Sequence, residues 1–263
     1  MTEILIGDFV IVLLIFIRII SMIVTAPVLS NSAFPVLAKI FLAMVIAYIV
    51  FLTIDKSKII IELNLVSITL SGIREVLTGF IMGYMLNFIF YGISFAGTLI
   101  GFDMGLMMAE VMNPMQETSN NVVGEVIYYV SMMIFILING HHYIIGAVVA
   151  SFDVIPIAKF SVTLPVVQMI VKYSFAVFTI ALKIASPVLV SFFLIHIAEG
   201  IIARVIPNIQ VFFITQPAKI AVGFVFLSAL APIYVFAIKN LLQNYESQLT
   251  EIIRTMGVCI CLS

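Results

Sequence analysis

The sequence predicts an all-α integral membrane protein, and three observations support this fold class. Apolar residues make up 63% of the 263 residues, whereas charged residues make up only 10%. Ordinary soluble domains are about 45–50% apolar and about 25% charged, so this chain lacks the polar side chains needed to cover a water-facing surface. The other two observations are a series of long runs with few charges and an amphipathic segment near the C-terminus.

The charge-poor runs have the length of membrane spans. A helix needs about 20 residues to cross a hydrocarbon core about 30 Å thick. The third run would be roughly 40 Å long at about 1.5 Å per residue, so it must tilt, kink or protrude. We expect about six apolar helical segments in one domain, residues 1–263, with these runs: Leu5–Leu29, Val36–Ile54, Val76–Phe102, Val126–Phe152, Tyr173–Ala198 and Ile220–Ile238.

The two ends of the chain differ from these runs. No basic region precedes the first run, so we expect a retained helix there and not a cleaved signal peptide. After Lys239, apolar residues recur at helical spacing among polar ones, which predicts an amphipathic C-terminal helix on the membrane surface or on a partner. Its apolar residues are Leu241, Leu242, Tyr245, Leu249, Ile252 and Ile253.

Composition and motifs also exclude several functions. A net charge of -1 gives no basic surface for nucleic acid. Cys259 and Cys261 have no second pair of ligands or disulfide partners, so we interpret them as incidental. His141, His142 and His196 are too scattered for a metal site, and we expect structural or interfacial roles. No catalytic grouping is present, so the sequence predicts neither an enzyme nor a cofactor.

Small residues recur four apart at the end of the third run. Gly97, Gly101 and Gly105 form two consecutive GxxxG steps. Such spacing leaves a helix face bare and lets another backbone approach closely, which is how helices associate in lipid. These close-packing glycines fit either a helix crossing within the chain or a surface that packs tightly against other subunits.

A cluster of methionines follows these glycines, just before a polar stretch. Methionine is flexible and polarisable, so such a cluster fills an irregular space or forms a soft constriction that repacks around variable contents. Acidic residues flank the region and suit either a solvated loop or a cavity at membrane depth. They are Asp103, Glu110, Glu117 and Glu125.

Three stretches carry motifs in a fixed order along the chain. Gly200–Gly223 contains Ala-Arg-x-x-Pro, Val-Phe-Phe and Pro-x-Lys-Ile-x-x-Gly. Gly97–Pro114 has an Ala-Gly-x-x-Ile-Gly stretch that ends in Asn-Pro, and Asn139–His142 is followed by Ser-Phe and Ile-Pro pairs. Together they resemble the FliR family of flagellar biosynthetic proteins, which is related to the injectisome SctT family. Asp103 stands where the family pattern suggests glutamine, and Asn113 where aspartate is more usual.

The resemblance implies a subunit of the flagellar type III export gate, in the bacterial inner (cytoplasmic) membrane at the flagellar basal body. The implied partners are FliP-like and FliQ-like subunits, an FlhB-like subunit, membrane lipid and the unfolded flagellar proteins that pass through the gate. One FliR-like chain closes a ring of the other subunits. The resemblance also implies helical hairpins, with bends at Pro187, beside Lys183, and at Pro232.

The resemblance places a plug of the gate at Gly105–Asn121. We expect a deformable apolar constriction there, because a protein-conducting gate must hold back ions while admitting chains of any sequence. The plug or gate candidates are Met107, Met108, Met112, Asn113, Pro114 and Met115.

The Gly200–Gly223 stretch supplies the interface candidates Arg204, Pro207, Pro217 and Lys219. These residues suit either a turn that anchors two helices or an interface that seats the subunit in the ring. Arginine beside apolar segments seeks a carboxylate or several carbonyls, and Glu199 is a possible partner for Arg204 within the chain.

Two other functions remain as alternatives. One is the equivalent subunit of a virulence injectisome, which has the same architecture. The other is a small-solute transporter, which would use broken helices and buried ionisable groups at the membrane midplane. The sequence shows no paired, Gly/Pro-interrupted inverted repeats, which argues against the transporter.

Overall fold

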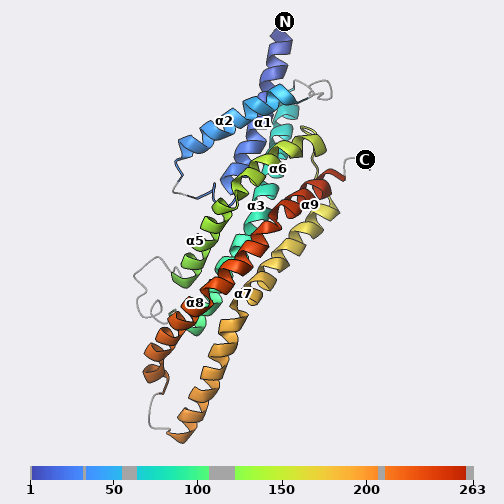
Figure 1. Cartoon of the computed structure of the whole chain (residues 1–263). Helices are drawn as coiled ribbons and strands as arrows, with labels where there is room; N and C mark the ends of the chain where they lie inside the picture. Colours follow the sequence, from blue (N-terminus) through green and yellow to red (C-terminus); the bar gives the residue numbers. More distant parts are fainter. Residues whose placement is uncertain (1, 32–33, 55–63, 107–121, 207–210, 259–263) are drawn as a thin grey trace. The chain divides into compact units, whose positions relative to one another are not determined.

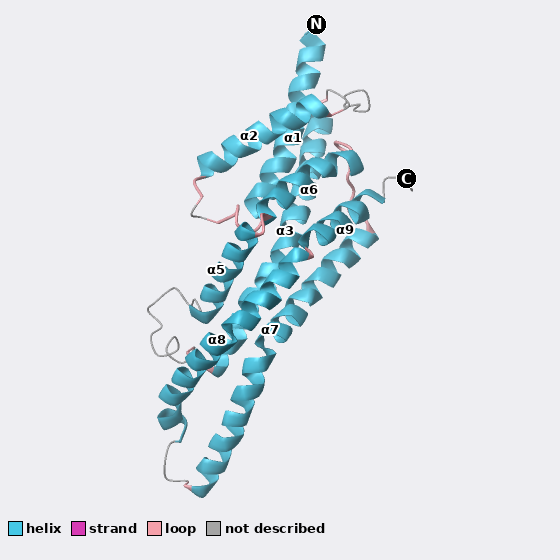
Figure 2. Cartoon of the chain, viewed as in Figure 1, coloured by secondary structure: helices cyan, strands magenta, loops and turns pink. Residues whose placement is uncertain are grey.

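The computed structural model describes residues 2–31, 34–54, 64–106, 122–206 and 211–258. Every regular element in these ranges is an α-helix, as Figure 2 shows, so the predicted all-α class is confirmed. Figure 1 shows their order along the chain: α1 (Thr2–Thr25), α2 (Val36–Thr53), α3 (Leu65–Asp103), α5 (Val122–Leu137), α6 (Gly140–Val154), α7 (Leu164–Val205), α8 (Val211–Gln243) and α9 (Tyr245–Val258).

The predicted number of long apolar segments is also confirmed. Within the described residues, five helical stretches are long and apolar enough to cross a membrane, and a sixth is added if α5 and α6 count as one bent span. The third stretch is longer than expected, because α3 begins at Leu65 and includes Arg74 and Glu75 before the charge-free run.

The fourth run is not one continuous helix, which corrects the expectation for Val126–Phe152. It consists of α5 and α6, which are bent by 70° relative to each other at a short break. Asn139 lies at this break with a left-handed backbone, φ 59°. Asparagine tolerates this conformation better than most residues, and Asn139-Gly140 is a recognised turn dipeptide.

The prolines do not mark hairpin bends, which corrects a second expectation. Helix α7 continues through Pro187, and α8 continues through both Pro217 and Pro232. Proline within a helix is tolerated in membrane proteins because neighbouring groups satisfy the backbone carbonyls that it leaves unpaired.

Contacts divide the chain into two compact units. The first comprises residues 1–88, 139–174 and 244–263, and the second comprises residues 89–138 and 175–243. The first unit therefore holds α1, α2, α6, α9 and the N-terminal parts of α3 and α7. The second holds α5, α8 and the remaining parts of α3 and α7.

In the first unit, α1 packs against both α2 and α3. Its fully buried residues are Leu14, Ile15, Ile19 and Met22. The α3 backbone lies close to α1 at Gly79 and Gly83, where a Cβ would collide with the Arg18 carbonyl and the Thr25 hydroxyl. The absence of side chains at these two glycines is what permits the approach.

The C-terminal helix packs within the first unit. Helix α9 contacts α6, and the residues of its apolar face are buried: Leu249, Ile252, Ile253 and Met256. The predicted amphipathic helix is confirmed in α9, whereas Leu241 and Leu242 belong to α8. The apolar face of α9 lies on α6 of the same chain, which corrects the expectation of a membrane surface or a partner.

In the second unit, aromatic contacts join the helices. Phe90 of α3 makes an edge-to-face contact with Phe135 of α5, with ring centroids 5.5 Å apart. Phe192 of α7 meets Phe226 of α8 in the same geometry at 6.3 Å. Edge-to-face pairs at these separations add stability beyond the area that they bury. Helix α5 also packs against α8.

Candidate functional site

The first unit contains a completely buried ion pair between α1 and α3. Arg18 Nε donates to Glu75 Oε2 at 2.5 Å, and Arg18 Nη2 donates to Glu75 Oε1 at 3.1 Å. Both side chains have no exposed area. The contact is bidentate, which is the strongest arrangement of a guanidinium and a carboxylate.

Helix α6 and the turn after it supply further partners for Arg18. Its Nη1 donates to the carbonyl and the hydroxyl of Ser151, each at 3.3 Å, and to the carbonyl of Ile155 at 3.0 Å. The guanidinium carbon lies 4.2 Å from the centre of the Phe152 ring, which adds a cation–π contact. Because these contacts satisfy the guanidinium on several sides, its burial is tolerated.

The carboxylate of Glu75 is held from a second direction. The backbone N–H of Ala158 donates to Glu75 Oε1 at 2.8 Å, and Arg74 Nη1 donates to the Ala158 carbonyl at 2.8 Å. Ala158 has a left-handed backbone, φ 66°. The network therefore ties α1, α3 and the turn after α6 together through one charged centre.

A second polar cluster lies in the second unit, between α7 and α8. Lys219 Nζ lies 2.6 Å from Glu199 Oε2, and only 4% of the Lys219 side chain is exposed. His196, one helical turn before Glu199, lies with Nδ1 3.2 Å from Lys219 Nζ. Asp103, the last residue of α3, has Oδ1 4.0 Å from His196 Nε2. We call these four residues the acid–base cluster.

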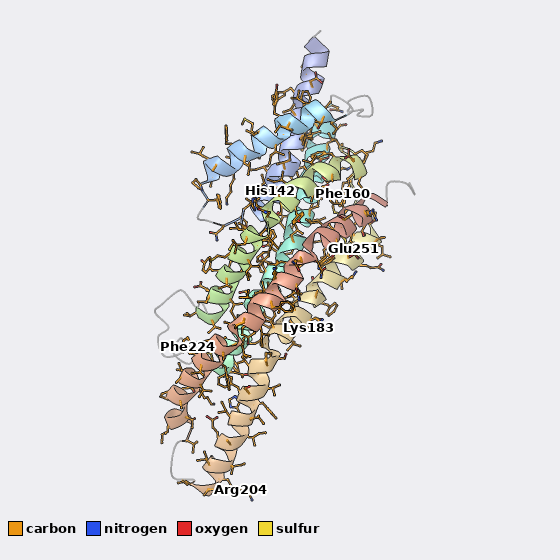
Figure 3. The ribbon with its side chains drawn as sticks, viewed as in Figure 1. His142, Phe160, Lys183, Arg204, Phe224 and Glu251 are labelled. Atoms are coloured by element: carbon orange, nitrogen blue, oxygen red, sulfur yellow. The ribbon has the colours of Figure 1, made fainter. Side chains whose placement is uncertain are left out.

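The interface candidates occupy different environments. Lys219 is buried in the acid–base cluster, while Pro217 is exposed on α8. Arg204 is exposed in the last turn of α7, and Figure 3 shows it at the end of that helix. Pro207 lies outside the described residues. Glu199 pairs with Lys219 and not with Arg204, so the suggested pairing with Arg204 is wrong.

Two of the close-packing glycines, Gly97 and Gly105, contact other helices of the same unit. A Cβ on Gly97 would lie 2.5 Å from the Cα of Gly124 in α5, so the two backbones are nearly in contact. Gly105 has a positive φ of 78° and lies against the side chain of Gln216, which donates to the Met104 carbonyl at 3.2 Å. Gly101 is buried.

The plug candidates cannot be placed in the same way. Met107, Met108, Met112, Asn113, Pro114 and Met115 all lie outside the described residues. The same holds for Cys259 and Cys261.

The hydropathy pattern does not reveal the role of Glu75. The charge-poor run begins at Val76, so Arg74 and Glu75 lie just outside it. A usable signal was present: Arg18 stands inside an apolar run, and a charge at membrane depth needs an opposite charge from another helix.

The charged groups of both clusters connect different helices. Among the described residues, no group of three or more His, Cys, Asp or Glu is arranged to hold a metal ion. The Arg18–Glu75 network joins α1, α3 and α6, and the acid–base cluster joins the end of α3 to α7 and α8.

Comparison with known proteins gives matches along almost the whole chain. Residues 9–245 match the family described as bacterial export proteins, family 1. The chain is 29% identical to the flagellar biosynthetic protein FliR of Bacillus subtilis (strain 168), over 94% of this chain and 95% of that protein. It is 25% identical to FliR of Escherichia coli (strain K12), over 90% of each, and 23% identical to FliR of Aquifex aeolicus (strain VF5), over 90% and 92%.

Proposed function

We propose the function of this chain from one premise, that the chain belongs to the bacterial export proteins of family 1 and, within them, resembles the FliR flagellar biosynthetic proteins throughout. The chain is a membrane subunit of the flagellar type III export gate. It helps to form the channel through which unfolded flagellar proteins leave the cell, and it has a structural and not a catalytic role.

One observation supports a subunit of a larger assembly: the exposed apolar surface is longer than a bilayer is thick. The part of α7 in the second unit, Phe175–Val205, is about 45 Å long at about 1.5 Å per residue. Large apolar residues are exposed along all of it: Phe175, Phe178, Leu182, Val190, Phe193, Leu194, Ile197, Ile201, Ile202 and Val205.

Lipid alone cannot cover this surface. The hydrocarbon core is about 30 Å thick, and spanning helices tilt by about 20° on average and rarely beyond about 40°. A 45 Å apolar helix segment exceeds that thickness even when tilted to this limit. Exposed apolar surface of this extent is typical of protein–protein contacts, so other subunits are needed to cover the remainder.

The partners that we propose are FliP-like and FliQ-like subunits, together with an FlhB-like subunit. The location is the bacterial inner membrane at the flagellar basal body. The flagellar system is favoured over a virulence injectisome because the curated relatives carry flagellar names. A role of Arg204, Pro207 and Pro217 in seating the subunit in its ring is part of the same proposal.

Purification from the native membrane tests this function. The full chain, tagged and expressed at its natural level, is extracted in mild detergent, and the co-purifying proteins are identified by mass spectrometry. FliP-like and FliQ-like chains are expected. A deletion strain is expected to stop exporting flagellin, and the intact gene is expected to restore export. Normal flagellin export by the deletion strain would reject the proposal.

A further inference from the structure

The acid–base cluster opens onto a surface cavity in the second unit. The cavity has a volume of about 380 Å³ and is lined by Asp103, His196 and three apolar residues of α7, Leu189, Val190 and Phe193. Val190 and Phe193 are 62% and 63% exposed. The cavity therefore has an apolar rim and a polar wall formed by Asp103 and His196.

The His196 ring lies among groups of opposite charge. Its Nδ1 is 3.2 Å from Lys219 Nζ, which can only donate, and 3.3 Å from Glu199 Oε2, which can only accept. The other ring nitrogen, Nε2, faces Asp103.

Asp103 is the less satisfied of the two carboxylates in the cluster. Glu199 pairs with Lys219 at 2.6 Å, whereas Lys219 and His196 attract Asp103 only at longer range, and the 4.0 Å from Asp103 Oδ1 to His196 Nε2 is too long for a hydrogen bond. Among the described residues, Asp103 accepts no hydrogen bond from a side chain or from the backbone. The side chain of Asp103 is only 22% exposed.

The position of Asp103 adds to this deficit. It is the last residue of α3, and the C-terminal end of a helix carries a partial negative charge. A carboxylate in an apolar membrane protein surface is costly unless a cation or a cavity compensates it. The chemistry that completes this site is therefore a cation presented by an otherwise apolar segment.

We propose that this cavity receives a lysine or arginine side chain from an apolar helix of a neighbouring subunit of the export apparatus. The basic group pairs with Asp103, and the apolar part of that helix covers Val190 and Phe193. This inference rests on the proposed function, because it requires that the chain works in an assembly. The inference specifies which surface of the chain a neighbouring subunit covers and which chemical group that subunit presents.

Charge substitutions in the full chain, recovered from cells with its assembly, test the pairing. Removing one partner of a buried charge pair weakens an interface strongly. Asp103→Lys is therefore expected to lower the yield of co-purified partner subunits by about tenfold or more, and Asp103→Asn by a smaller factor. Glu125→Lys is the matched control, because Glu125 is an exposed carboxylate on α5 of the same unit, and it is expected to leave the yield unchanged.

A photo-cross-linking amino acid at Val190 identifies the occupant without changing any charge. The expected cross-linked peptide is an apolar helix of another subunit with a lysine or arginine within one helical turn of the linked residue. Exchanging that basic residue for aspartate is expected to restore the yield of the Asp103→Lys variant. If Asp103→Lys is degraded in cells, Asp103→Asn and the cross-link decide the question.

Several results would overturn the inference. One is a Val190 cross-link that forms only with lipid, with a second copy of this chain or with a segment that has no basic residue. Another is an unchanged yield of co-purified partner subunits with Asp103→Lys. They are distinct from a failure of the proposed function, which would appear in the unsubstituted chain as an absence of flagellar export subunits. If the unsubstituted chain assembles normally and any of these results is found, only the proposed occupant of the cavity is rejected, and the proposed function stands.

Discussion

The guanidinium of Arg18 and the carboxylate of Glu75 form a bidentate ion pair from which water is fully excluded. Arg18 belongs to α1 and Glu75 to α3, and they are 57 residues apart in sequence. The pair is therefore a tertiary contact and not a local one. Its charged groups are also satisfied by Ser151 of α6 and by the backbone at Ala158, so the network joins three separate parts of the first unit.

Removing either partner of this pair should destabilise the protein severely. Arg18→Met leaves a buried carboxylate, and Glu75→Gln leaves a buried guanidinium without its counter-charge. Each single change is expected to lower the free energy of unfolding by about 3–5 kcal/mol, and Arg18→Met with Glu75→Met by less than the sum of the two. Reversible unfolding in mixed micelles, followed by circular dichroism, measures these differences.

The exposed pair of Lys172 and Glu251 is the matched control for that experiment. Lys172 Nζ lies 2.8 Å from Glu251 Oε1, but the side chains are 67% and 51% exposed. Lys172→Ala is expected to cost at most about 1 kcal/mol, because water and salt screen exposed pairs. A similar cost for both pairs would contradict the structural importance given to Arg18.

Alanine at Gly97 should have the opposite effect from alanine at Gly146. At Gly97 a Cβ would meet the α5 backbone at Gly124, and backbone cannot move aside as a flexible side chain can. Gly97→Ala is expected to destabilise by about 1–3 kcal/mol. At Gly146 no atom lies within 4 Å, so Gly146→Ala is expected to stabilise α6 by about 0.4–1 kcal/mol. Equal signs for the two variants in the same unfolding assay would refute this account.

Helix α9 should detach when its apolar face is weakened. Ile252 is fully buried within the first unit, where α9 packs on α6, and Ile252→Ala is expected to lower the free energy of unfolding by about 2–5 kcal/mol. Hydrogen exchange checks this locally, since the amides of α6 and α9 should exchange faster than those of α2. Thr250→Ala, at an exposed position of the same helix, is expected to change the exchange rates little. Unchanged exchange in the Ile252 variant would show that α9 does not depend on this face.

Lys219 should matter for stability far more than Lys183. Lys219→Met leaves the Glu199 carboxylate without its ammonium partner, and the expected cost is about 3–5 kcal/mol. Adding Glu199→Gln should recover part of that loss. Lys183→Met is the control, because Lys183 is exposed in the middle of α7, and it is expected to stay within about 0.5 kcal/mol. The same micelle unfolding assay compares all three, and a large loss in the Lys183 variant would oppose this view.

Composition and hydrophobic runs predicted where the helices lie in the sequence better than they predicted which helices contact one another. The second run, Val36–Ile54, differs from α2 only at its last residue, because Pro35 and the charged cluster after Ile54 limit the helix from both sides. The amphipathic spacing of α9 likewise identified its buried face. The bounds of α2 and the apolar face of α9 are both set by residues that are neighbours in the sequence, so a local pattern is enough to predict them.

Two of the failures share a different cause, since the pairings of Glu199 and of Glu75 each depended on a residue of another helix. The pairing of Glu199 with Lys219, and not with the nearer Arg204, depends on how α7 and α8 align. Hydropathy averages also hide turns: the break at Asn139 lies inside an apolar run, and only the Asn-Gly dipeptide signals it. Glu75 was missed because a charge at the edge of a run looks solvated until its partner is known.

The separation of Arg18 from its partners sets an order for biosynthesis. Translation proceeds at about 5–20 residues per second, so Glu75 is added roughly 3–11 s after Arg18, and Ser151 later still. During that interval the nascent α1 bears a cation with no counter-charge, and lipid is a poor environment for it. The pairing of Arg18 therefore has to wait for the ribosome to deliver the third helix.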